Sequence, residues 1–101
     1  MAIAEVSVVP LGTGTPSVSQ YVARAVKVLE QEKDMKYELT AMGTIIEGDL
    51  DRILGVVRKM HEETFGQGVA RVLTTIKIDD RRDKAQTMKG KLDSVSRKLR
   101  A

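Results

Sequence analysis

The order in which the hydrophobic period changes along the chain constrains its fold more than any other feature. Apolar and polar residues alternate over 2–9, 37–49 and 69–78, which is typical of half-buried strands. Between these segments, apolar residues recur at helical spacing, first over 18–29 and then over 50–60. Gly43 permits a tight turn or bulge, so it divides 37–49 into two short strands. The sequence therefore predicts strand, helix, strand, strand, helix, strand.

This order is that of the split βαβ, or ferredoxin-like, arrangement of the α+β class. It gives one antiparallel sheet with two helices on one face, so the other face must be solvated or covered. Val6 and its alternate neighbours share the apolar face of the first strand, whereas Glu5 and Ser7 share the other. Val9 and Leu73 fall on this second face. Such a mixed surface suits a subunit contact or the floor of a ligand site.

The helix boundaries are predicted from capping residues. Thr15 is a good N-cap for the first helix, of about four turns, with Pro16 at the first helical position. Asp49 can cap the second helix in the same way. Asp79 or Asp80 can cap a third helix, which we expect within 84–101 at the C-terminal side of the ferredoxin-like unit.

The expected third helix carries its apolar residues at alternating spacings of three and four, which form a heptad seam: Ala85, Met88, Leu92, Val95 and Leu99. About two heptads are too few for a free coiled coil. The seam is therefore expected to dock on its own subunit or on a partner subunit.

Length and composition narrow the class of protein. The 101 residues suffice for one domain, spanning 1–101, with a modest core. A net charge of +3, with 17 basic and 14 acidic residues interspersed, does not favour nucleic-acid binding. The chain has no cysteine and no apolar run near the roughly 18 residues of a membrane span. We expect a cytoplasmic protein with neither a membrane nor a nucleic acid as partner.

The glycine-rich segment GTGTPS, residues 12–17, has two readings. Its backbone N–H groups and the following helix N-terminus can cradle an anion. The segment lacks the lysine of a P-loop and the third glycine of a dinucleotide fingerprint. The same residues also suit a structural turn, so both readings remain open.

Few residues suggest catalysis or metal binding. Glu47 and Asp49 can contact a cationic ligand, or can be an edge residue and a helix cap. His61 lies on an apolar stripe, where a core-edge histidine is the usual case. The HEE segment at 61–63 lacks the second histidine of a zinc helix. We therefore expect no catalytic residue, no metal and no cofactor.

The segment IDDRRDK, residues 78–84, concentrates charges of both signs in a turn. Arg81 and Arg82 can bind a phosphate or a carboxylate through two hydrogen bonds each, and Lys84 can assist them. The alternative is an intramolecular cluster of ion pairs.

Several motifs together resemble the small thiamine-binding-protein family of bacteria, archaea and fungi. They are PLGTG at 10–14, YELTAMGTIIEGD at 37–49, HE at 61–62, RVLTTIKIDDRRDK at 71–84 and KLDSV at 91–95, in order and over nearly the whole chain. The resemblance implies a ferredoxin-like fold assembled as dimers or tetramers. It also implies binding of thiamine or of its hydroxymethylpyrimidine part rather than catalysis.

A pocket for thiamine needs polar partners for the pyrimidine, an apolar slot and an acid near the cationic thiazolium. Together with the resemblance, this predicts three groups of contacts. The predicted hydroxyl contacts are Thr13, Thr15, Ser17 and Thr44, and the predicted apolar walls are Val9, Met42 and Ile45. The predicted acid is Glu47. Asp49 is less suited because it is farther from the loop.

The predicted function is non-catalytic binding of thiamine or its pyrimidine, as a carrier, sensor or salvage accessory. Two alternatives remain. One is an oligomeric structural or regulatory protein with an unidentified small ligand. The other is an enzyme acting on a small metabolite, in which His61 or Glu47 would be the general acid or base.

Overall fold

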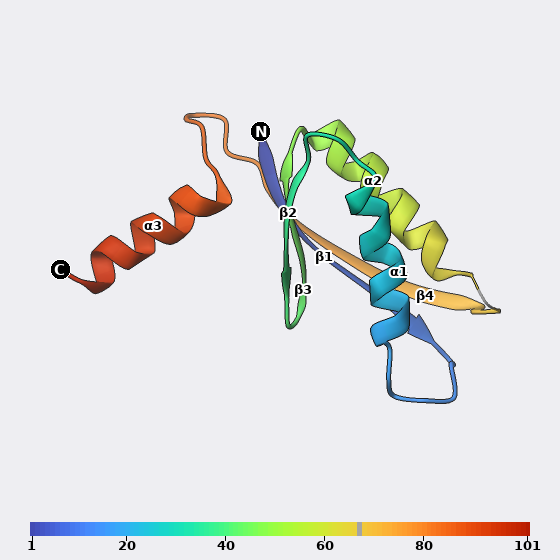
Figure 1. Cartoon of the computed structure of the whole chain (residues 1–101). Helices are drawn as coiled ribbons and strands as arrows, with labels where there is room; N and C mark the ends of the chain where they lie inside the picture. Colours follow the sequence, from blue (N-terminus) through green and yellow to red (C-terminus); the bar gives the residue numbers. More distant parts are fainter. Residues whose placement is uncertain (67) are drawn as a thin grey trace.

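The computed structural model describes residues 1–66 and 68–101 and contains four strands and three helices (Figure 1). In chain order these are β1 (Ala2–Leu11), α1 (Ser19–Glu30), β2 (Lys36–Thr40), β3 (Gly43–Gly48), α2 (Leu50–Thr64), β4 (Arg71–Asp79) and α3 (Met88–Leu99). The strands form one sheet in the order β2-β3-β1-β4, and every neighbouring pair is antiparallel. The ferredoxin-like arrangement and the additional C-terminal helix are therefore confirmed.

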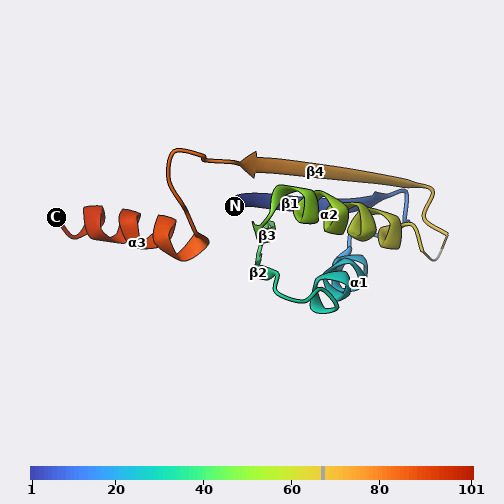
Figure 2. The ribbon, with the colours of Figure 1, turned by 90° about the horizontal axis from the view of Figure 1, so that it is seen from above.

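The register of β1 decides which residues enter the core. Val6 lies opposite Thr44 of β3 on one side and opposite Ile76 of β4 on the other. The even-numbered residues of β1 face α1 and α2, which lie together on one side of the sheet (Figure 2). The core therefore combines small and branched side chains of β1 with the apolar stripes of both helices, including Ala4, Val6, Leu29, Ile46, Ile53 and Met60.

The opposite face of the sheet carries the odd-numbered residues of β1, as the alternation predicts. The first turns of α3 lie against one end of this face, and the rest of α3 extends away from the body (Figure 1). None of the residues 88–99 is buried, and the apolar Leu92, Val95 and Leu99 are exposed. The heptad-spaced side chains thus lie largely outside the core of their own chain.

Two predicted helix starts need correction. The helix α1 begins at Ser19 with Val18 as N-cap, because the Thr15 hydroxyl accepts a hydrogen bond from the N–H of Ser17 and closes a local turn instead. The helix α3 begins at Met88, because Thr87 accepts from the N–H of Gly90 at 2.9 Å. Thr87 therefore takes the cap position predicted for Asp79 or Asp80, and Ala85 lies before the helix.

Asp49 occupies the predicted N-cap position of α2 in an extended conformation, although its side chain makes no capping hydrogen bond within the described residues. None of the helices in the described part of the chain is long and apolar enough to cross a membrane.

Candidate ligand-binding site

The glycine-rich loop between β1 and α1 is a turn held by its own hydroxyls. Gly12 and Gly14 have φ of 77° and 80°, a region that disfavours residues with a Cβ. The Thr13 hydroxyl donates to the carbonyl of Thr15 at 2.9 Å, and the Thr15 hydroxyl accepts from Ser17. Two of the predicted ligand contacts, Thr15 and Ser17, are exposed on this loop, and Thr13 is half-buried.

A cavity of about 270 Å³ lies between α1, the central strand β1 and the tip of the β2–β3 hairpin. We call it the hairpin cavity. Val22 and Val26 of α1 and the N-cap residue Val18 form one wall, and residues 39–44 of the hairpin form the other. The hairpin tip is fixed because the Thr40 hydroxyl donates to the carbonyl of Gly43 at 2.9 Å. The side chains described in its lining carry no charge.

The hairpin cavity brings together three of the predicted contacts. Thr44 is only 4% exposed, Val9 lies on β1, and Met42 lies at the exposed tip of the hairpin. Val18 follows the glycine-rich loop directly, so the loop leads into the cavity wall. The hydroxyl-bearing side chains of the loop itself do not line the cavity. Thr44 pairs with Val6, and residues 7–11 of β1 lie between that pair and the loop.

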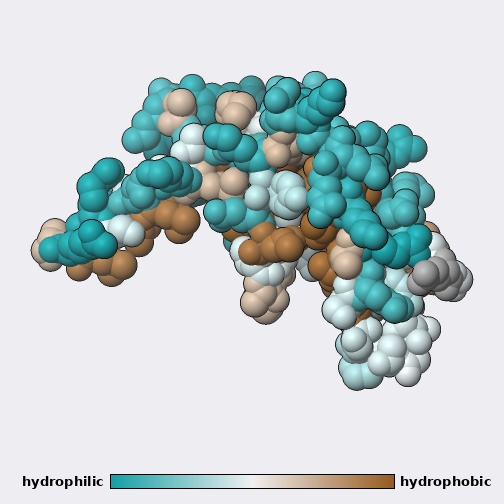
Figure 3. All heavy atoms as spheres, viewed as in Figure 1, coloured by the Kyte–Doolittle hydropathy of each residue, from teal (hydrophilic) through white to brown (hydrophobic). Residues whose placement is uncertain are grey.

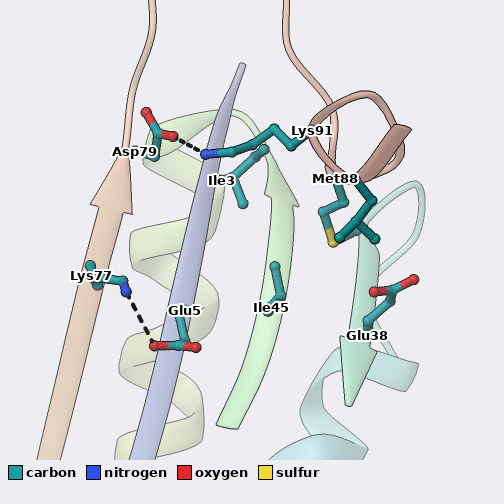
Figure 4. Close-up of a pocket in the computed structure, with 9 residues that line it drawn as sticks. Ile3, Glu5, Glu38, Ile45, Lys77, Asp79, Met88 and Lys91 are labelled. Carbon is teal, nitrogen blue, oxygen red and sulfur yellow. Dashed lines mark hydrogen bonds and ion pairs between the residues drawn. The ribbon is translucent and has the colours of Figure 1, made fainter. Parts of the chain in front are cut away.

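A second cavity of about 250 Å³ lies on the other face of the sheet, under the first turns of α3. We call it the open-face cavity. Ile3, Ile45 and Met88 contribute apolar walls, and charged side chains of three strands surround them (Figure 4). Glu5 and Lys77 form an ion pair at 3.8 Å across β1 and β4, and Lys91 of α3 pairs with Asp79. Ile45, a predicted contact, therefore lies apart from Thr44 and Met42.

Glu47 has a structural partner that the sequence did not predict. Its side chain is 4% exposed, and its Oε1 accepts a hydrogen bond from the backbone N–H of Met88 at 2.9 Å. The carboxylate thereby meets the positive end of the α3 dipole. The contact joins residues 41 positions apart in the sequence, so no local pattern can predict it. Glu47 holds the start of α3 against the sheet and lines neither of the two cavities described above.

The only histidine of the chain connects two elements. His61 Nδ1 lies 2.6 Å from the Thr74 hydroxyl of β4, and the His61 ring meets Phe65 edge-on with centroids 5.2 Å apart. This environment agrees with the core-edge interpretation of His61. Among residues 1–66 and 68–101, no cluster of three or more acidic, histidine or cysteine side chains is placed to hold a metal ion.

The charged side chains of the turn after β4 form ion pairs with one another. Arg81 donates two hydrogen bonds to Asp83, at 2.5 and 2.9 Å, and Arg82 pairs with Asp80 at 2.8 Å. These guanidinium groups hold the pKa values of Asp83 and Asp80 below their usual range. The arrangement matches the intramolecular ion-pair interpretation of this turn.

The family model for thiamine-binding proteins matches residues 4–96. The chain belongs to this family. It is 50% identical to the UPF0045 protein YqgV of Bacillus subtilis, over 98% of both chains. It is also 44% identical to a UPF0045 protein of Methanothermobacter thermautotrophicus, over 98% of this chain and 100% of that protein.

Solved structures of other proteins share this fold. The hypothetical protein MJ1052 of Methanocaldococcus jannaschii superposes with a TM-score of 0.86 and is 44% identical, over 94% of this chain and 95% of the other. A Thermotoga maritima protein, named provisionally for thiamine biosynthesis or salvage, superposes with a TM-score of 0.76, over 93% and 97% of the two chains. At 21% identity this second likeness concerns the fold alone.

Proposed function

We propose that this chain binds thiamine or its hydroxymethylpyrimidine part without catalysing a reaction, as a carrier, sensor or salvage accessory. Membership of the thiamine-binding protein family supports the ligand class. We assign the pyrimidine to the hairpin cavity. The observation that carries this assignment is the buried Thr44 in an uncharged cavity that is lined mostly by apolar side chains.

The chemistry of the hairpin cavity suits an aminopyrimidine ring. A flat heteroaromatic ring gains from contact with apolar walls such as Val22 and Val26, and its nitrogens need a few well-placed polar partners. Thr44 and the backbone groups of the hairpin offer such partners. The cationic thiazolium would then project toward solvent, because burying a charge without a counter-charge is costly.

Isothermal titration calorimetry with thiamine, thiamine diphosphate and hydroxymethylpyrimidine tests the proposal. We expect binding of thiamine and of the pyrimidine. Thr44→Val, which removes the hydroxyl at nearly constant volume, should weaken both about tenfold, the usual effect of losing one hydrogen bond. Ser96→Ala removes an exposed hydroxyl from α3 and should bind as the wild type does.

The double variant Thr13→Ala with Ser17→Ala tests whether the ligand contacts the glycine-rich loop rather than the hairpin cavity. If this variant loses affinity and Thr44→Val does not, the ligand contacts the glycine-rich loop and the assignment to the hairpin cavity is wrong. The absence of heat with all three compounds would refute thiamine binding as such.

We also propose that the chain associates with copies of itself, as a dimer or tetramer. Apolar side chains are exposed on α3 and on β4, and Figure 3 shows those of α3 gathered along one side of the helix. Exposed apolar surface of this kind is typical of interaction sites.

A further inference from the structure

The hairpin cavity reaches from the core of the molecule to the solvent. Its lining includes Val6, Ala25 and Met60, which are only 2%, 0% and 1% exposed and form its floor. Leu39 and Met42 belong to the same lining but are 60% and 84% exposed, so they lie at its mouth. A ligand that fills the cavity therefore has a buried inner end and an outer end beside two exposed apolar side chains.

The turn that carries Met42 is unusual for a hairpin of its length. Thr40 pairs with Gly43, so Ala41 and Met42 alone form the loop. Two-residue hairpin loops favour Gly, Asn or Asp, because the preferred turns need a positive φ at one or both loop residues. Neither Ala41 nor Met42 is such a residue, and neither has a positive φ. The geometry of the turn therefore does not explain a large apolar side chain at position 42.

The Met42 side chain is free to move over the mouth of the cavity while the backbone of the turn stays in place. The Thr40 hydroxyl donates to the carbonyl of Gly43 at 2.9 Å and accepts from the N–H of Met42 at 3.3 Å, so the turn is held by its own hydrogen bonds. The tip projects from the body of the molecule, and residues 40–42 are exposed (Figure 1). Methionine is unbranched with three rotatable bonds, so a change of side-chain rotamer suffices to move the thioether.

We propose that Met42 is the lid of the hairpin cavity, and that its side chain folds over the outer face of the bound ring and slows release of the ligand. This inference rests on the proposed function and names the residue that closes that site. Sulfur makes favourable contacts with aromatic rings at about 5 Å, so the lid favours flat aromatic ligands over saturated ones of the same size. Closure also removes the apolar surface of Met42 from water.

The five methionines of the chain make the lid directly observable. Met42 and Met60 line the hairpin cavity at its mouth and its floor, Met88 lines the open-face cavity, and Met1 lines neither. In a nuclear magnetic resonance spectrum of isotope-labelled methionine methyl groups, hydroxymethylpyrimidine should shift the Met42 and Met60 signals through its ring current. The signals of Met1 and Met88 should stay in place.

Two substitutions at the same position measure the contribution of the lid. Met42→Ala removes the side chain and should raise the dissociation rate of the pyrimidine about tenfold. Met42→Leu keeps an apolar side chain of similar size and should retain most of the affinity. Because Met42 is 84% exposed, neither change should alter the urea midpoint. Leu54→Ala is the matched control, since Leu54 is 41% exposed on α2, lies outside the cavity lining and should not affect binding.

Calorimetry distinguishes failure of the lid from failure of the proposed function. If the pyrimidine binds but the Met42 signal does not move, or if Met42→Ala releases it as slowly as the wild type does, the lid is wrong and the binding proposal stands. If Met88 responds in place of Met42, the ligand lies in the open-face cavity, and both the lid and the assignment to the hairpin cavity are wrong. If the pyrimidine and thiamine both fail to bind, the two proposals fail together.

Discussion

At the scale of single residues, two glycines show how the space around a position decides whether a larger side chain is tolerated there. Gly43 begins β3, where an added Cβ would lie 2.9 Å from the backbone carbonyl oxygen of Val6. That oxygen belongs to the central strand and cannot move without disturbing the sheet. Gly55 lies in the middle of α2, and an added Cβ there would meet nothing within 4 Å.

We expect opposite effects from the two alanine substitutions. Gly43→Ala should lower the free energy of unfolding by about 1–3 kcal/mol, because it overpacks the β1–β3 contact. Gly55→Ala should raise it by about 0.5–1 kcal/mol, because glycine is a poor helix former. Urea unfolding at one fixed protein concentration measures both. Equal effects at the two positions would contradict this account.

At the scale of elements, α3 depends on polar contacts rather than on burial. Its start is held by Glu47, and its first turns are held by the ion pair between Lys91 and Asp79. The hydrogen bond from Lys91 is the main reason why the pKa of Asp79 lies below its usual value of 3.8. The docked helix therefore favours the ionised form of Asp79.

Docking of α3 should consequently weaken in acid. A carboxylate whose pKa is lowered by docking contributes above its free pKa, and the contribution is lost as the pH falls through the lowered value. Hydrogen exchange of the α3 amides, corrected for the intrinsic rate, should accelerate between about pH 5 and pH 3. Lys91→Met keeps the aliphatic stem and should lose part of this pH dependence. An unchanged pH profile in that variant would show that the ion pair does not hold α3.

Elements and caps differ in how far the sequence predicts them. The hydrophobic periods predicted every strand and helix in order, because the alternation along β1 and the stripe of α2 directly reflect their burial. The start of α1 was predicted wrongly, because the Thr15 hydroxyl has a competing partner two residues away. The strand β4 was predicted over 69–78 and is observed at Arg71–Asp79.

The candidate site was less predictable than the fold. The sequence grouped Thr44, Ile45 and Glu47 because they are neighbours, but alternate residues of a strand point to opposite faces. Thr44 therefore lines the hairpin cavity, whereas Ile45 and Glu47 lie on the other face. The valines of α1 that complete the hairpin cavity look like ordinary core residues in the sequence, and no local signal separates them from the rest of the stripe.

At the scale of the whole molecule, stability and assembly should be linked. A folded dimer that dissociates on unfolding becomes more stable as the protein concentration rises. The melting temperature of the wild type should therefore increase between micromolar and tenfold higher concentrations. Circular dichroism at several concentrations measures this, and a constant wild-type midpoint would speak against a dissociating assembly.

The strand order also has a consequence for synthesis. The first strand made, β1, lies in the middle of the sheet, and its partners along residues 3–11 belong to β4, near the other end of the chain. During synthesis, β1, both core helices and the β2–β3 hairpin therefore leave the ribosomal exit tunnel before β4, the strand that completes the sheet. Until residue 79 is outside the exit tunnel, one side of β1 has no neighbour. The nascent chain must keep that side from pairing with the wrong strand, and the time it spends in this state grows with every pause in translation.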